Sequence, residues 1–170
     1  MAPNKRFGFT LVEMLVVTGI MLATTGFGIA RYNDYTQQRR LDQEGKKLFS
    51  VFELASKRAI SGDSTTACAD FQGIQVSINP AGTYTMRRCC EGACSSAQSS
   101  IYSTTTLPTG ITFEDPKATT TYLFNKLTQT MTMNPSTNPN ITLRNAMVSK
   151  CIILSVTPAG LIDVSAVSSC

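Results

Sequence analysis

The chain has 170 residues, enough for one domain with a substantial core. Only 15% of them are charged, against roughly 25% in a typical soluble domain, and 42% are hydrophobic, which excludes a disordered protein. The net charge of +4 is too small to indicate a nucleic-acid partner by itself. Because the chain has no His, it lacks the imidazole that Ser-His and Cys-His nucleophile pairs require.

Apolar side chains are concentrated in residues 9–30, where Glu13 is the only charged residue. At about 1.5 Å per residue, a helix of this length spans roughly 33 Å, the thickness of the hydrocarbon core of a bilayer. Lys5 and Arg6 precede the stretch and Arg31 follows it. The stretch is too long for a secretory signal peptide and for most buried helices of soluble domains. We therefore expect a membrane-spanning helix.

Glu13 is the informative residue of this stretch. A carboxylate inside a bilayer costs about 2.5–3.5 kcal/mol even on permissive insertion scales, so such acids are usually paired or functional. No basic side chain lies nearby within the stretch, and an ordinary signal anchor leaves Glu13 unexplained. An α-amino group is a natural partner, and cleavage between Gly8 and Phe9 would create one four residues before Glu13.

Residues 5–13 read Lys-Arg-Phe-Gly-Phe-Thr-Leu-Val-Glu. This segment resembles the class III signal of type IV prepilins and type II secretion pseudopilins: a short basic leader ending in Gly, then Phe, then an apolar run with Glu at its fifth position. The resemblance implies that a prepilin peptidase removes residues 1–8 by cleavage after Gly8 and that the new amine of Phe9 is N-methylated. It also implies that Glu13 neutralises the N-terminus of a neighbouring subunit during filament assembly.

The same resemblance implies the partners and the location of the chain. The partners would be the prepilin peptidase/methyltransferase, other pilin or pseudopilin subunits and an inner-membrane assembly platform. Lys5 and Arg6 favour a cytoplasmic N-terminus, although Arg31, Arg39 and Arg40 on the far side weaken this bias. With the cysteines, the signal favours a single-pass protein of the inner membrane whose exported part joins an extracellular or periplasmic filament.

Beyond the apolar stretch, residues 31–62 predict an amphipathic continuation of the helix. Apolar residues recur there at helical spacing, namely Leu41, Leu48, Phe52, Ala55 and Ala59. Gly62 is typical of a helix C-cap. One helix over residues 9–61 is therefore expected, with its second half packed on a domain.

Residues 63–170 change to the period-two pattern of β-strands, so the expected fold class is α+β with an antiparallel sheet. Turns at 79–82 and 157–160, both containing Pro-Ala-Gly, predict two hairpins. Residues 90–106 and 134–140 are polar and are expected to form surface loops. Strands are expected at residues 74–78, 83–86, 111–114, 122–126, 127–133, 141–144, 151–156 and 161–164.

This layout, with a hairpin after the helix, residues 107–113 in the middle and a last hairpin around Gly160, resembles the H-type minor pseudopilins and T-type fimbrial minor pilins. The expected function is a structural filament subunit rather than an enzyme, with no cofactor or metal. The alternatives are a type II secretion pseudopilin, a minor pilin in DNA uptake that contacts DNA through Arg87 and Arg88, and, more distantly, a membrane-anchored enzyme.

The six cysteines fit an exported, disulfide-bonded domain. Extending the register of the first hairpin places Cys68 near Cys94, with Cys89 and Cys90 also within reach. The last hairpin places Cys151 near Cys170, and the pairing of Cys89 and Cys90 stays open. A four-Cys zinc site is less favoured, because residues 89–94 lack the usual pair of C-x2-C knuckles.

Overall fold

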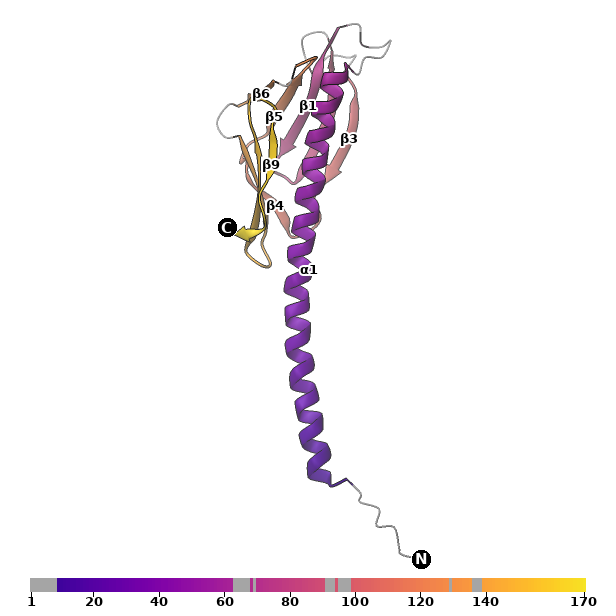
Figure 1. The fold of residues 1–170 in the computed structure, drawn as a ribbon, viewed down its shortest axis with the longest axis vertical. Helices are drawn as coiled ribbons and strands as arrows, with labels where there is room; N and C mark the ends of the chain where they lie inside the picture. Colours follow the sequence, from indigo (N-terminus) through magenta and orange to yellow (C-terminus); the bar gives the residue numbers. More distant parts are fainter. Residues whose placement is uncertain are drawn as a thin grey trace, which may run out of the picture. The chain divides into compact units, whose positions relative to one another are not determined.

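The computed structural model describes residues 9–62, 68, 70–90, 94, 99–128, 130–135 and 139–170. It contains one long helix, α1 (Leu11–Ser61), followed by antiparallel strands, so the fold is α+β as the sequence predicts (Figure 1). The strands are β1 (Phe71–Asn79), β2 (Thr83–Cys90), β3 (Ile101–Thr106), β4 (Ile111–Asp115), β5 (Thr120–Asn125), β6 (Met131–Asn134), β7 (Asn140–Asn145), β8 (Lys150–Val156), β9 (Ile162–Val164) and β10 (Ser168–Ser169).

Both ends of α1 carry capping residues. At the N-terminus, the Thr10 hydroxyl accepts a hydrogen bond from the Glu13 backbone N–H at 3.2 Å, which satisfies one of the free donors of the first turn. At the C-terminus, Gly62 adopts a φ of 64° and donates its N–H to the Ala59 carbonyl at 3.3 Å. This left-handed conformation favours glycine, and it confirms the predicted C-cap.

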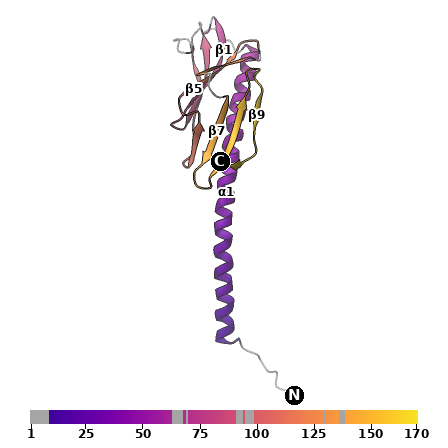
Figure 2. The same cartoon turned by 90° about the vertical axis from the view of Figure 1, so that its left-hand side faces the viewer.

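The strands form two sheets. The first has the order β3-β2-β1-β5-β6, and the second has the order β10-β8-β7-β4, with β9 also paired to β8. Both β9 and β10 therefore border β8 on the edge that β7 does not occupy. Figure 2 shows β7 and β9 of this sheet beside the C-terminal part of α1.

Contacts divide the chain into a unit that ends at Thr36 and a unit that begins at Gln37. The second unit has a single core between α1 and the two sheets. All five stripe residues of the helix are fully buried in it, and the Phe52 ring meets the rings of Tyr122 and Phe124 edge-on, at 5.2 and 6.0 Å between centroids. The two sheets meet through Tyr84 and Phe113, whose ring centroids are 6.4 Å apart.

Two close approaches of the backbone depend on glycine. A Cβ atom at Gly45 would lie 2.6 Å from Cδ1 of Ile152, so glycine lets α1 approach β8. Gly73, with a φ of 155°, lies at an irregularity of β1, and a Cβ there would overlap the Phe124 carbonyl oxygen. Both glycines therefore set how closely elements pack.

The hairpin β1–β2 and the strands β4, β5, β7, β8 and β9 lie where the sequence predicts them, within a few residues at each end. One prediction was wrong: the link over residues 90–106 contains β3, which pairs with β2 through Thr83↔Thr106 and Thr85↔Thr104. The strand predicted over residues 127–133 was too long at its start, because β6 begins only at Met131. A turn precedes β6, and Leu127 adopts a φ of 57° in it. Part of the predicted loop 134–140, residues 136–138, lies outside the described residues.

Candidate membrane and assembly segment

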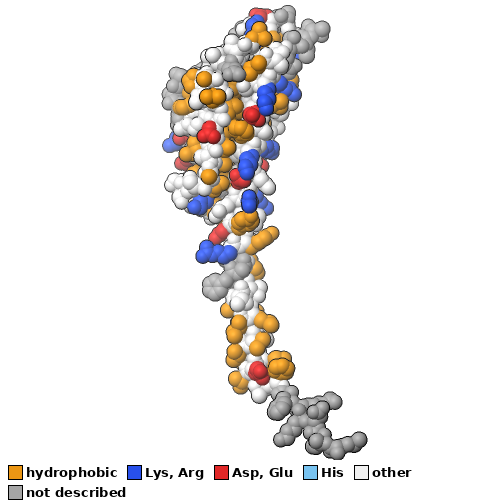
Figure 3. Space-filling view, viewed as in Figure 1, with side chains coloured by type: hydrophobic (Ala, Val, Ile, Leu, Met, Phe, Trp, Pro, Cys, Tyr) orange, Lys and Arg blue, Asp and Glu red, His pale blue; other side chains and the backbone are white. Residues whose placement is uncertain are grey.

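The first unit consists of the N-terminal part of α1. Every described side chain of residues 9–35 is exposed, including large apolar ones such as Leu11 (82%) and Leu22 (76%). The segment is long and apolar enough to cross a membrane, and none of its described side chains is buried within the protein. Figure 3 shows apolar side chains along this part of the helix. Such a surface is typical of a membrane anchor or a signal segment, because a soluble monomer rarely exposes so large an apolar patch.

The threonines of this segment satisfy their hydroxyl groups within the helix. Thr18 donates to the Met14 carbonyl at 2.9 Å, and Thr25 donates to the Met21 carbonyl at 2.7 Å. Hydrocarbon supplies no hydrogen-bond partners, so internal satisfaction lowers the cost of placing these residues in a bilayer. These threonines are therefore compatible with lipid, which leaves Glu13 as the costly residue of the segment.

Glu13 is exposed in the first turn of α1, and its carboxylate forms no ion pair with any residue that the structure describes. Phe9, four residues earlier, is 76% exposed, while Gly8 and the rest of the leader lie outside the described residues. Thr10 was missed as a site residue. Its signal was present, because Thr-x-x-Glu at residues 10–13 is the capping-box pattern of a helix start.

All six cysteines form disulfides, so none is a thiolate that could bind zinc. Cys151 pairs with Cys170, as the hairpin register predicts, and ties the C-terminus to β8. Among the described residues, no group of three or more acidic, His or Cys side chains is arranged to hold a metal ion.

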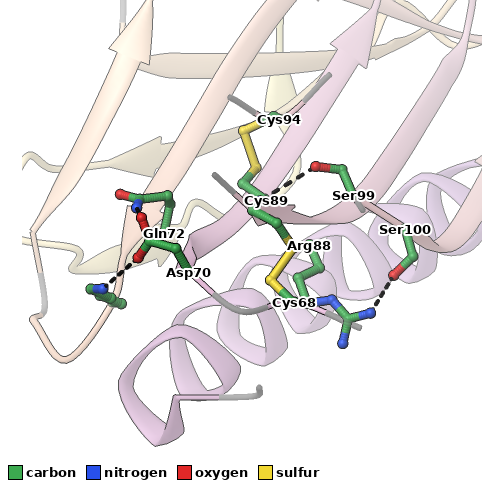
Figure 4. The surroundings of a disulfide bond; sticks show 10 residues. Cys68, Asp70, Gln72, Arg88, Cys89, Cys94, Ser99 and Ser100 are labelled. Carbon is green, nitrogen blue, oxygen red and sulfur yellow. Dashed lines mark hydrogen bonds and ion pairs between the residues drawn. A yellow bond between two sulfur atoms is a disulfide. The ribbon is translucent and has the colours of Figure 1, made fainter. Parts of the chain in front are cut away.

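The predicted pairing of Cys68 with Cys94 is wrong. Cys68 pairs with Cys90, and Cys89 pairs with Cys94 (Figure 4). The prediction extended the β1–β2 ladder to Cys68, but the ladder ends at Phe71↔Cys90, three residues after Cys68. Cys68 therefore bonds to Cys90, the last residue of β2 that pairs with β1. Cys94 bonds to Cys89, five residues earlier, and closes a short loop.

Arg87 and Arg88 point to opposite faces of β2, as adjacent residues of a strand must. Arg88 is buried and donates from Nη2 to the Ser100 hydroxyl at 3.1 Å (Figure 4). Its guanidinium lies 5.9 Å from the ring centroid of Tyr102. Arg87 is half-buried and donates to the Cys94 carbonyl at 3.0 Å. The two residues therefore do not form one exposed basic patch.

A shallow groove lies between α1 and the turn that joins β8 to β9. Its polar side chains are Glu53, Ser56 and Lys57, and the Lys57 Nζ lies 3.5 Å from the Glu53 carboxylate.

Elsewhere in the second unit, burial raises the pKa of Tyr84 and of Tyr122, with a further contribution from the Asp115 carboxylate at Tyr122. Each of these tyrosines packs in the core.

No family model, no curated protein and no solved structure matches this chain. Its architecture is nonetheless pilin-like: a long N-terminal apolar helix whose second half packs on antiparallel sheets. The three disulfides are typical of an extracytoplasmic domain.

Proposed function

We propose that this chain is a minor pilin or pseudopilin, a structural subunit that a prepilin peptidase processes and that assembles into a type IV pilus-like filament. One observation carries the proposal: an exposed apolar helix that contains a single carboxylate without an ion-pair partner among the described residues. Lipid covers such a surface before assembly, and the helices of neighbouring subunits cover it afterwards.

The unpaired carboxylate favours a filament subunit over a simple anchor. In a simple anchor, the Glu13 carboxylate would lie in the bilayer at a cost in free energy, with no ion pair to offset it. Cleavage after Gly8 creates an ammonium group at Phe9, which is also costly in hydrocarbon. When subunits stack, each group supplies the partner of the other, so pairing stabilises the filament rather than the isolated chain.

DNA binding is a weaker candidate. Phosphate contacts require accessible Lys or Arg side chains that act together. In this chain Arg88 is buried, and Arg87 already donates to a backbone carbonyl. An enzymatic role also finds little support, because the acidic and basic side chains of the groove on α1 pair with each other.

Processing is tested by the intact mass of the full-length chain after co-expression with a prepilin peptidase. We expect the loss of the first eight residues and the gain of one methyl group. Gly8→Val should block cleavage, because it replaces the glycine that ends the leader with a branched residue, so this variant keeps its full mass. Gly19→Val is the matched control, since no atom outside the backbone of the helix and the adjacent residues lies within 4 Å of a Cβ at this position.

We expect Gly19→Val to be processed like the wild type. If Gly8→Val and the wild type give the same product mass, the proposed processing is wrong. The two proposed assemblies, pilus and secretion pseudopilus, share this step, and they are separated by deleting the chain and measuring surface pili and protein export in the same strain.

A further inference from the structure

Three turns of the second unit lie together at one end of its strands. They are residues 79–82 between β1 and β2, 107–110 between β3 and β4, and 146–149 between β7 and β8. The Gly82 carbonyl accepts a hydrogen bond from the Leu107 N–H at 2.8 Å, and the Gly110 carbonyl accepts one from the Ala146 N–H at 3.1 Å. These bonds join the three turns into one surface, which we call the turn cluster.

The turn cluster contains no charged residue. Its exposed residues include Ala81, Pro108, Ala146 and Met147, and the Met147 side chain is 65% exposed. Met147 also reaches across the cluster, because a Cβ atom at Gly110 would lie 3.6 Å from its Cε. A surface of this kind can enter an apolar environment without the cost of desolvating an ion.

The turn cluster lies beside the residue of α1 at which the second unit begins. Asn145, which directly precedes the third turn, donates from Nδ2 to the Gln37 carbonyl at 3.2 Å. Gln37 follows Ala30, the end of the apolar stretch, by seven residues. Seven residues span about 10 Å as a helix and at most about 25 Å when extended. The turn cluster is therefore held close to the end of the apolar stretch by chain length alone.

We propose that the turn cluster binds the surface of the bilayer that holds the apolar stretch, with Met147 as its most deeply inserted side chain. This inference goes beyond the proposed function, since it requires a membrane-spanning helix but no filament. The headgroup layer adds roughly 5–8 Å on each side of the hydrocarbon core, so a group about 10 Å beyond the core lies at its outer boundary. The flexible methionine side chain extends from there towards the acyl chains.

Lipid fits the turn cluster better than a protein partner does. Protein partners are commonly selected by complementary charges, which this surface lacks, whereas the membrane interface accepts uncharged and apolar side chains. The other end of the unit differs. Leu127 is 73% exposed there and its N–H bonds to the Ala59 carbonyl, about 33 Å along α1 from Gln37. Its neighbour Lys126 is charged and pairs with Asp70 at 3.2 Å.

The test uses the purified full-length chain, without reductant, in phosphatidylcholine vesicles that contain a lipid with a spin label near its headgroup. All six native cysteines form disulfides, so a thiol-reactive fluorophore labels only an introduced cysteine. Thr109→Cys places the fluorophore in the turn cluster, and Leu127→Cys places it at an exposed turn of the other end. We expect the spin label to quench the fluorophore at residue 109 and not the one at residue 127.

Three variants of the Thr109→Cys chain test the role of Met147. Met147→Glu introduces a charge, so the equilibrium should shift about fivefold towards the unbound cluster, equivalent to about 1 kcal/mol. Met147→Leu keeps the apolar volume and should keep the quenching. Leu127→Glu is the matched control and should also keep it. Both positions are exposed, so these substitutions leave the core intact.

The lipid composition separates an apolar contact from an electrostatic one. Because the turn cluster has no charge, replacing part of the phosphatidylcholine with phosphatidylglycerol should leave the quenching unchanged. Quenching that requires the anionic lipid would contradict the proposal. Equal quenching at residues 109 and 127, or normal quenching in Met147→Glu, would contradict it as well.

A fluorophore at Val16→Cys, within the apolar stretch, separates this inference from the proposed function. It should be quenched by lipids that carry the spin label deep in the acyl chain. If Val16 is quenched and Thr109 is not, the binding of the turn cluster alone is wrong. If neither is quenched, the membrane span falls, and the proposed function falls with it. Quenching at Thr109 in a chain that is neither processed nor assembled supports the inference and contradicts only the proposed function.

Discussion

The two halves of α1 belong to one continuous helix but are stabilised differently. From residue 9 to residue 35 every described side chain is exposed, whereas from Leu41 to Ala59 a five-residue stripe is completely buried. Both halves lack proline; the first is apolar on all sides, whereas the second has apolar residues at helical spacing. The difference shows that the second half packs within the chain, whereas the first half exposes an apolar surface of the kind that a membrane anchor or a signal segment has.

The difference between the two halves is tested most strongly by the same substitution at one leucine in each half. Leu48→Ala removes a fully buried side chain from the packed half and should lower the free energy of unfolding by about 2–5 kcal/mol. Leu15→Ala, at a position that is 65% exposed, should change it by less than about 0.5 kcal/mol in detergent. Urea unfolding monitored by tyrosine fluorescence measures both, and equal effects would remove the distinction between the halves.

A substitution at Asn145 tests where α1 begins to pack on the strands. It is fully buried; its Nδ2 donates to the Gln37 carbonyl at 3.2 Å, and its Oδ1 accepts from the Met147 backbone N–H at 3.0 Å. Asn145→Ala removes both hydrogen bonds and leaves the Met147 N–H without its acceptor, so we expect a loss of about 1–3 kcal/mol. Hydrogen exchange should accelerate around residues 37–41 and stay unchanged near Ala59. Uniform acceleration along the helix would contradict a local role.

Tyr122, which packs on Phe52 of the packed half, should make stability depend on alkaline pH. Burial raises its pKa above the value near 10 of an unfolded chain, so the folded state disfavours the phenolate. The resulting stability is fully present below about pH 10 and is lost as the pH rises through the folded pKa. Tyr122→Phe should weaken this dependence in urea titrations between about pH 8 and 11, with little change near pH 7.

A larger pH dependence in Tyr122→Phe than in the wild type would contradict this assignment. The same substitution at Tyr84, whose pKa is also raised by burial, should act in the same direction. The substitution at Tyr122 is mild at neutral pH because its hydroxyl makes no hydrogen bond within the described residues.

The helix and most strands were predictable because their signals are local. Leu41, Leu48 and Phe52 mark one helix face by spacing alone, and all three are buried. The strand β3 was not predictable in this way. Its Thr-rich residues lack a clear apolar alternation, and pairing with β2 decides its conformation. The partner of Cys68 was also mispredicted, because the residue at which β1 stops pairing with β2 depends on the whole fold and not on the hairpin alone.

The candidate site was predictable in part. Glu13 was recognisable because a charge in an apolar stretch is costly wherever the chain folds. The carboxylate has no ion-pair partner among the described residues, so the proposed pairing of Glu13 with a neighbouring N-terminus stays a prediction.

The most direct measurement compares two glutamates of the same helix. Glu13→Gln should be processed normally but should fail to enter filaments, because a neutral amide cannot balance the ammonium group of a neighbour. Glu53→Gln, which removes only an exposed pair with Lys57, should assemble like the wild type. The assembled fraction of processed chains, measured for both variants in one host, decides the matter. If Glu13→Gln assembles as well as Glu53→Gln, the proposed pairing of Glu13 with a neighbouring N-terminus is contradicted; if the wild type itself does not enter filaments, the proposed role as a filament subunit is contradicted.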